Sequence, residues 1–225
     1  MLETIRTALV IAPHPDDEVL GCGGTIARLS GLGCDVHVGI VTRADGPDFA
    51  PDVVEIGRRE AHAAHHLLGV KQTHYLDLPA AALDRVAHSE MNKAIGKLVA
   101  DVEPDTVFVP FLGDVHLDHQ LVFLSSLVAV RPRNAKTPLR VYAYETLSET
   151  NWYAPGITPT FAPNVYVDIS GFLDRKIEAF SCFASQIKAF PDERSKPAIH
   201  ALATLRGATV YKQAAEAFML IRQIA

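Results

Sequence analysis

A regular alternation of short apolar runs and amphipathic segments between residues 7 and 130 constrains the fold more than any other feature. The apolar runs contain β-branched residues and predict buried strands, whereas the segments between them carry apolar residues at helical spacing. Alternating strands and helices form right-handed βαβ units, so we predict an α/β fold: a three-layer α/β/α, Rossmann-like arrangement with a mostly parallel sheet. Strands are predicted at residues 7–12, 34–43, 73–78 and 106–110, and helices at 23–32, 58–68, 89–102 (with Ser89 as N-cap) and 119–130.

The pattern changes after residue 138. Two further strands flank a loop rich in Pro, Thr and aromatic residues, which is long enough to suggest a cover over a substrate. The strands are predicted at 139–146 and 164–169, the loop at 147–163, and closing helices at 171–183, 195–205 and 211–223. Because no repeat or low-complexity linker divides the chain, residues 1–225 are predicted to form a single domain.

Composition narrows the class of protein. The chain is 48% hydrophobic. Its formal net charge is −5, so the chain as a whole does not attract nucleic acid. Its three cysteines are odd in number and widely spaced, so a disulfide framework is not expected and a reduced, cytoplasmic setting is. No apolar run reaches the ~18 residues that a membrane-spanning helix needs.

The first chemical motif, His14-Pro15-Asp16-Asp17-Glu18, follows the first predicted strand directly. Three adjacent acids beside a histidine repel one another, and a bound cation would offset that repulsion. The same acids could instead form the acidic first turn of a helix, where the helix dipole favours them. Glycines at residues 21, 23 and 24 do not make a dinucleotide loop, because their spacing is wrong and the acids would repel a pyrophosphate.

The second motif contains His116, Asp118 and His119 and follows the predicted strand at 106–110. On its own this spacing is a weak signal, since two surface histidines would explain it. Both motifs, however, follow strands whose carboxyl ends meet at one edge of the sheet. Together they offer two histidines and a carboxylate around an open position, which is typical of catalytic zinc sites.

The remaining histidines have no such neighbours in the sequence. Three of them share one predicted helix, and we expect them to be mostly solvated or interfacial: His62, His65 and His66. Four others are isolated and are expected to have no role in the site: His37, His74, His88 and His200.

At these two motifs the sequence resembles the PIG-L/LmbE-like family of zinc-dependent N-acetyl deacetylases. Further similarity extends over most of the chain, including Gly23-Gly24, Thr42-Arg43, Arg59-Glu60 and Arg206-Gly207. The resemblance implies that zinc is the cofactor and that its ligands are His14, Asp17 and His119. It also implies that Asp16 is the general base, that His116 stabilises the oxyanion in protonated form, and that Asp118 orients His116.

The resemblance extends to the substrate, a small N-acetylated amino sugar, but not to every residue that would bind it. Many family members carry an arginine three residues before the glutamate of the second helix, and here that position is Gly57. Arg43 and Arg59 are therefore candidates for contacting the substrate. Trp152 and Tyr153 in the 147–163 loop could stack on a sugar ring.

Other functions remain open at this point. The same ligand set could hold iron(II) for oxygen chemistry. A zinc-dependent hydratase of an unsaturated dicarboxylic acid would need cationic anchors, and Arg43, Arg58 and Arg59 could provide them. A non-catalytic metal-binding module is a third alternative, although a structural zinc site would use four protein ligands, often cysteines. A homo-oligomer is also expected, with the predicted helix 211–223 as its contact face.

Overall fold

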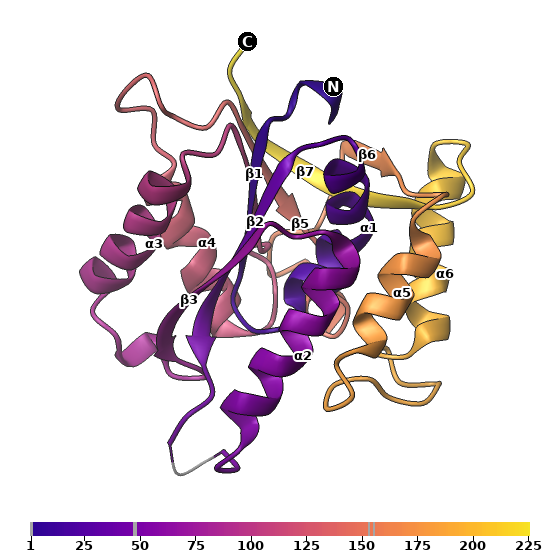
Figure 1. Cartoon of the computed structure of the whole chain (residues 1–225), viewed down its shortest axis with the longest axis horizontal. Helices are drawn as coiled ribbons and strands as arrows, with labels where there is room; N and C mark the ends of the chain where they lie inside the picture. Colours follow the sequence, from indigo (N-terminus) through magenta and orange to yellow (C-terminus); the bar gives the residue numbers. More distant parts are fainter. Residues whose placement is uncertain (1, 47–48, 153, 155) are drawn as a thin grey trace.

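In the computed structural model, which describes residues 2–46, 49–152, 154 and 156–225, seven strands form one sheet in the order β3-β2-β1-β4-β5-β7-β6 (Figure 1). The first five strands in that order are parallel, whereas β7 runs antiparallel to both β5 and β6. The bounds are β1 Thr7–Ala12, β2 Asp35–Arg43, β3 Gln72–Pro79, β4 Thr106–Val109, β5 Arg140–Tyr144, β6 Val165–Asp168 and β7 Ala215–Gln223. The predicted Rossmann-like, mostly parallel sheet is confirmed.

Helices cover both faces of the sheet and make the other two layers (Figure 1). One face carries α1, α2, α5 and α6, and the other carries α3 and α4. Their bounds are α1 Asp17–Gly31, α2 Val53–Leu68, α3 His88–Val102, α4 Leu117–Ala129, α5 Leu173–Ser181 and α6 Lys196–Thr209, with short 3-10 turns at Leu2–Thr4, Leu83–Arg85 and Thr150–Trp152. Of the helices in the described part of the chain, none is long and apolar enough to cross a bilayer.

Strand β1 shows why the sheet is buried on both faces. Ala8 and Val10 point to the core under α1, whereas Leu9 and Ile11 point to the core under α3 and α4. Successive side chains of a strand point to opposite faces, so a strand that is covered on both sides has to be apolar throughout. The run TALVIA meets this requirement and places β1 at the centre of the sheet.

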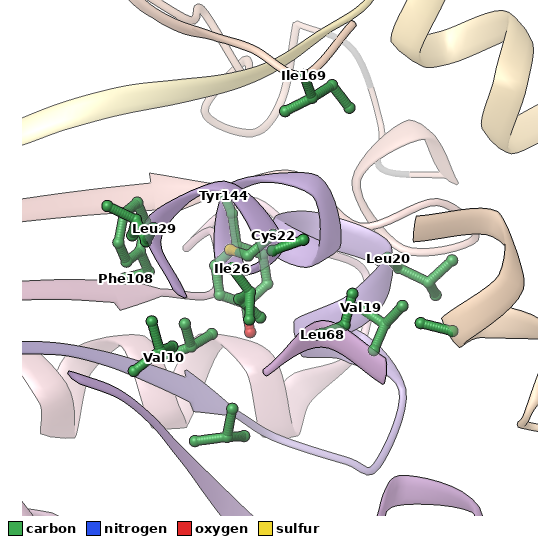
Figure 2. Packing of buried hydrophobic residues seen from close by; sticks show 14 of the residues in the cluster. Val10, Val19, Leu20, Cys22, Ile26, Leu29, Leu68, Phe108, Tyr144 and Ile169 are labelled. Carbon is green, nitrogen blue, oxygen red and sulfur yellow. The ribbon is translucent and has the colours of Figure 1, made fainter. Parts of the chain in front are cut away.

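The glycines after the first motif serve close packing of α1. A Cβ atom on Gly21 would lie 2.3 Å from the ring of Tyr144, and one on Gly24 would lie 2.7 Å from Ile169. Figure 2 shows Tyr144 against α1, beside Cys22 and Ile26. Tyr144 is the last residue of β5, and its hydroxyl donates to the carbonyl oxygen of Ile11 in β1 at 2.9 Å, which fixes the ring under α1. These glycines therefore position the helix that begins at Asp17.

The prediction of a C-terminal helix at 211–223 is wrong. Residues Ala215–Gln223 form β7, which pairs with β5 on one side and β6 on the other. Its first four residues are all buried, so the strand lacks the alternation that would separate it from a buried helix. The sequence analysis also expected this helix to be the contact face of a homo-oligomer. That expectation has no basis in the structure, because the segment is paired on both sides within the sheet.

Helix boundaries differ from the predictions at their N-terminal ends. Helix α1 begins at Asp17 rather than at residue 23, and α2 begins at Val53 rather than at residue 58. Ser89 is not a cap, because α3 begins at His88 and its N-cap is Ala87. Hydrophobic periodicity identifies the middle of a helix better than its ends, so these helix starts are predicted too late.

Candidate metal centre and catalytic pocket

The two sequence motifs meet at the carboxyl ends of β1 and β4, which are neighbours in the sheet. The chain runs from β1 outward to β2 and β3, and then returns to the other side of β1 as β4. Such a point, where the strand order reverses, leaves a crevice at the strand ends in open α/β sheets. His14 follows β1 and His116 follows β4, so both motifs border this crevice.

Three side chains in the crevice form a group that could hold a metal ion: His14, Asp17 and His119. Their ligand atoms all lie within 4.8 Å of one another. Asp17 Oδ2 lies 3.2 Å from His14 Nδ1 and 3.2 Å from His119 Nε2. Asp17 Oδ1 and His119 Nε2 are buried and have no hydrogen-bond partner among the described residues. Buried polar atoms are rarely left unsatisfied, so these residues fit a bound cation.

Asp17 lies in the first turn of α1, and Oδ2 also accepts a hydrogen bond from the backbone N–H of His14 at 2.9 Å. Burial acts to raise the pKa of Asp17, but the imidazoles of His119 and His14 hold that pKa well below its usual value. Both sequence interpretations are compatible with this arrangement. Asp17 and Glu18 are the acidic first turn of a helix, and Asp17 also belongs to the group that could hold a metal ion.

Asp114 is a site residue that the sequence analysis did not identify as functional. Its buried carboxylate lies 2.8 Å from His119 Nδ1, and the hydroxyl of Thr150 donates to its other oxygen at 2.6 Å. A carboxylate behind a metal-binding histidine fixes the ring orientation and leaves the other ring nitrogen for the metal. Its position five residues before His119, in the loop that follows the buried strand β4, was the available signal.

Asp16 lies beside the metal-binding group with an unusual backbone. Its φ of 113° falls in the region that favours glycine, and non-glycine residues held there cost on the order of 1–3 kcal/mol. Its backbone N–H donates to Glu18 Oε2 at 3.1 Å. Burial and the negative charge of Asp17 raise the pKa of the Asp16 carboxyl well above its usual value, although Arg194 opposes this shift.

Arg194, from the segment between α5 and α6, is a second residue that the sequence did not reveal. Its Nη1 donates to Asp16 Oδ2 at 3.0 Å, and its Nε donates to the hydroxyl of Ser148 at 2.8 Å. Burial acts to lower the pKa of Arg194, but the charges of Asp16 and other acids raise it. No pattern marks this arginine in the sequence, because its partner precedes it by 178 residues.

His116 is the N-cap of α4 rather than part of the helix. Its Nδ1 accepts a hydrogen bond from the backbone N–H of Asp118 at 3.1 Å, so this nitrogen carries no hydrogen. Burial and the nearby His14 lower the pKa of His116. This geometry leaves Nε2 as the donor of the ring and favours the neutral imidazole, whereas the sequence analysis expected a protonated one.

The sequence analysis expected the carboxylate of Asp118 to orient His116, but in the described part of the chain no hydrogen bond joins these two side chains. Asp118 Oδ2 lies 3.1 Å from His14 Nε2 and accepts the backbone N–H of Ala81 at 2.7 Å. His14, His116 and Asp118 also have ligand atoms within 4.8 Å of one another, so a second possible metal-binding group shares His14. Asp118 thus supports His14 through its side chain and His116 only through its backbone.

A cavity of about 360 Å³ opens above this group. His14, Asp16 and His116 line its polar part, and Arg194 closes one side. Its apolar part is lined by Phe49, Val53, Val54, Tyr75 and Phe183. This volume is in the range of small-molecule sites.

Only some of the residues that the sequence predicts to contact the substrate line this cavity. Arg43 lines it and pairs with Asp45, whereas Arg59 is exposed and lies outside the lining. Its neighbour Arg58 does line the cavity, pairs with Asp77 and lies 4.6 Å above the ring of Tyr75. Trp152 is 66% exposed, donates to Glu193 and does not line the cavity. Tyr153 lies outside the described residues.

The expectations about the other histidines hold only in part. His62 and His66 are exposed as expected, whereas His65 is buried and lies 2.9 Å from Glu18 Oε1. His37 and His74 pair with each other on neighbouring strands, with 3.1 Å between Nδ1 and Nε2, and neither lines the cavity.

Known proteins are similar to this chain in sequence and in fold. A diacetylchitobiose deacetylase from Thermococcus kodakarensis is 28% identical over 84% of this chain and 72% of its own length. A 1D-myo-inositol 2-acetamido-2-deoxy-α-D-glucopyranoside deacetylase from Mycobacteroides abscessus is 28% identical over 97% of this chain and 93% of its own length. The solved structure of GalB, a 4-carboxy-2-hydroxymuconate hydratase from Pseudomonas putida, has a TM-score of 0.78 and 22% identity over 98% of each chain, a likeness of fold alone.

The family assignment follows from a match that covers both motifs. Residues 9–130, more than half of the chain, match the family PIG-L, described as GlcNAc-PI de-N-acetylase. This span runs from β1 to the end of α4 and contains His14–Glu18 and His116–His119. The chain belongs to the PIG-L family.

Proposed function

We propose that this chain is a zinc-dependent hydrolase that removes the N-acetyl group from an amino-sugar-type substrate. One observation carries the proposal: among the described residues, Asp17 Oδ1 and His119 Nε2 are buried without a hydrogen-bond partner, beside the residues Asp16 and His116 that line the cavity. A cation would satisfy both atoms, and a substrate in the cavity would meet the two remaining polar groups. Family membership and relatives named as deacetylases support the same activity.

His14, Asp17 and His119 would hold the zinc. When bound, zinc would lower the pKa of a coordinated water towards ~7 and polarise the amide carbonyl. Asp114 keeps His119 in the tautomer that leaves Nε2 free for the metal. Asp118 restrains His14 from the opposite side.

Asp16 is the proposed general base. It accepts a proton from the attacking water and later passes a proton to the leaving amine, which is the usual task of a carboxylate at such a site. Arg194 donates to Oδ2 and leaves Oδ1 free to face the reacting atoms. His116 donates its Nε2–H to the oxygen on which negative charge develops, and its Nδ1 bond to the Asp118 amide keeps the ring in that tautomer.

The arginines at the cavity favour a deacetylase over a hydratase of a dicarboxylic acid. Arg43 and Arg58 each pair with a neighbouring aspartate, so their charges are largely offset. A dicarboxylic acid would have to compete with Asp45 and Asp77 for these cations. The apolar wall made by Tyr75 and Phe49 suits the face of a sugar ring instead.

A direct assay tests the proposal. Protein freed of metal with a chelator, and the same protein reloaded with zinc, is incubated with a panel of N-acetylated amino sugars. Release of acetate together with a free amine, in a 1:1 ratio and only by the zinc form, is the expected result. If the zinc form hydrates an unsaturated dicarboxylic acid and releases no acetate, the hydratase is correct. Activity that returns with iron(II) and oxygen, and not with zinc, would identify an iron enzyme.

A further inference from the structure

A buried chain of hydrogen bonds runs from β3 through α2 to the backbone of Asp16. The hydroxyl of Thr73 lies 2.6 Å from His65 Nδ1, and His65 Nε2 lies 2.9 Å from Glu18 Oε1. The other oxygen of Glu18 accepts the backbone N–H of Asp16 at 3.1 Å. Glu18 is fully buried and His65 is nearly so.

The donors and acceptors along this hydrogen-bonded network match one another. A carboxylate can only accept, so His65 Nε2 carries a hydrogen and donates to Glu18. Nδ1 of the same ring pairs with the hydroxyl of Thr73, which can donate or accept. Each of these side chains therefore has a partner, and satisfied buried networks are rigid.

Asp16 needs such support more than an ordinary residue. Its φ of 113° is one that side chains rarely adopt, so the surrounding structure has to hold it there. At that φ its amide points to the interior, where Glu18 Oε2 is its acceptor. Releasing the amide would let the backbone relax. The carboxylate of Asp16, which accepts a hydrogen bond from Arg194 and lines the cavity, would then move.

We propose that Glu18 and His65 are positioning residues that hold the backbone of Asp16 in its catalytic conformation. The inference rests on the proposed role of Asp16 as general base. It assigns a function to the last acid of the first motif and to a histidine on a different helix. His65 reaches the active site only through Glu18, so its effect has to appear as a change at Asp16 rather than as a lost substrate contact.

The test compares four variants of the full-length protein loaded with zinc. His65→Leu removes the donor to Glu18, whereas His65→Gln keeps an N–H at nearly the same point. Thr73→Val removes only the far hydroxyl and is the milder change if His65→Leu folds poorly. His66→Leu is the matched control, because it makes the same substitution at the exposed neighbouring position.

Deacetylation kinetics give the first readout. His65→Leu is expected to lower kcat on the order of 10- to 100-fold with KM nearly unchanged and about one zinc per chain retained. His65→Gln should restore most of the loss, and Thr73→Val should lower kcat by roughly 2- to 10-fold. A fall in zinc content that parallels the fall in kcat would mean that the chain supports metal binding and not Asp16.

Hydrogen exchange of the Asp16 amide, measured by NMR on the native proteins, gives a readout that needs no turnover. The amide is expected to exchange at least ~10-fold faster in His65→Leu and as slowly as in the wild type in His65→Gln and His66→Leu. Unchanged protection in a folded His65→Leu protein overturns the proposal, even if activity falls. If the wild type releases no acetate, the proposed function fails, and the exchange data still decide whether the chain holds Asp16.

Discussion

The guanidinium of Arg194 lies 3.0 Å from the carboxylate of Asp16, although 178 residues separate them in the sequence. Arg194 also donates to Gln186 and to Ser148, so the loop segments on either side of the cavity meet at this one side chain. Its charge acts directly on the ionisation of Asp16, because it counters the upward shift that burial and Asp17 cause.

Replacing Arg194 by Met should therefore raise the pKa of Asp16 further. A general base works only when ionised, so the acidic limb of the pH profile of kcat/KM should move to higher pH. Activity on the acidic side of neutrality should fall on the order of 10-fold or more, and the loss should shrink as the pH rises. Lys196→Met, an exposed cation two residues away, serves as the control. A loss that is equal at every pH would show that Arg194 contacts substrate instead of tuning Asp16.

Asp16→Asn should retain zinc and lose most of its turnover. Asparagine keeps the shape of the side chain but cannot accept a proton from water, and a general base typically contributes about 10²–10⁴ in rate. Metal analysis and steady-state kinetics on the same preparation check this. Should the variant lose its zinc, Asp16 and Asp17 would have the opposite roles to those proposed.

Asp114→Asn should weaken zinc binding more than it changes turnover by the loaded enzyme. The amide is a poorer hydrogen-bond acceptor than the carboxylate, so His119 becomes a weaker ligand, and such changes typically cost 10- to 100-fold in metal affinity. Competition with a chromogenic chelator measures the affinity. Asp174→Asn, an exposed aspartate on α5, should bind zinc like the wild type.

His116→Ala should keep the metal and lower kcat by roughly 10²- to 10³-fold, with a much smaller effect on KM. The reason is that its Nε2–H meets negative charge that develops only during the reaction. Because His116 accepts at Nδ1 and its pKa is lowered by burial and His14, we expect the alkaline limb of the wild-type profile not to report its deprotonation. Asp118→Asn should accordingly leave that limb in place. A shift of the limb to lower pH in this variant would instead indicate that His116 acts in its protonated form.

Lys176→Met should destabilise the protein by about 3–5 kcal/mol, as expected when one partner of a buried ion pair is removed. Lys176 Nζ donates to Glu216 at 2.6 Å and to the carbonyl oxygen of Leu20 at 2.7 Å, with both charged side chains buried. Urea unfolding monitored by circular dichroism measures the change. Arg175→Met, on the exposed side of the same helix, should have little effect, and adding Glu216→Gln to Lys176→Met should recover part of the loss.

The sequence predicts the first half of the fold well because its central strands β1 and β4 are covered on both faces and are apolar almost throughout. The run at residues 7–12 coincides with β1, and both motifs follow strands whose ends meet, as the parallel topology requires. It fails for β7, whose neighbours β5 and β6 come from distant parts of the chain and remove the alternation that would mark a strand. Pairing with distant partners overrides local preference in sheets.

The candidate site divides in the same way. Residues within the two motifs are predictable, since their spacing and their position after strands place them together. Arg194 and His65 are not, because each contributes through one partner that is remote in sequence. Asp114 lies between these cases, close to the second motif but distinguished only by its contacts with His119 and Thr150.

The position of β7 affects how the chain can fold during synthesis. This strand follows both β5 and β6 in sequence but lies between them in the sheet, so neither can complete its pairing until residues 215–223 have left the ribosome. Glu216 on β7 also accepts hydrogen bonds from the backbone N–H groups of Gly24 and Thr25. These contacts of α1 therefore form only after β7 has been synthesised. The nascent chain therefore carries an open sheet edge and an unsecured active-site helix until its last strand inserts, a period in which exposed edges favour aggregation.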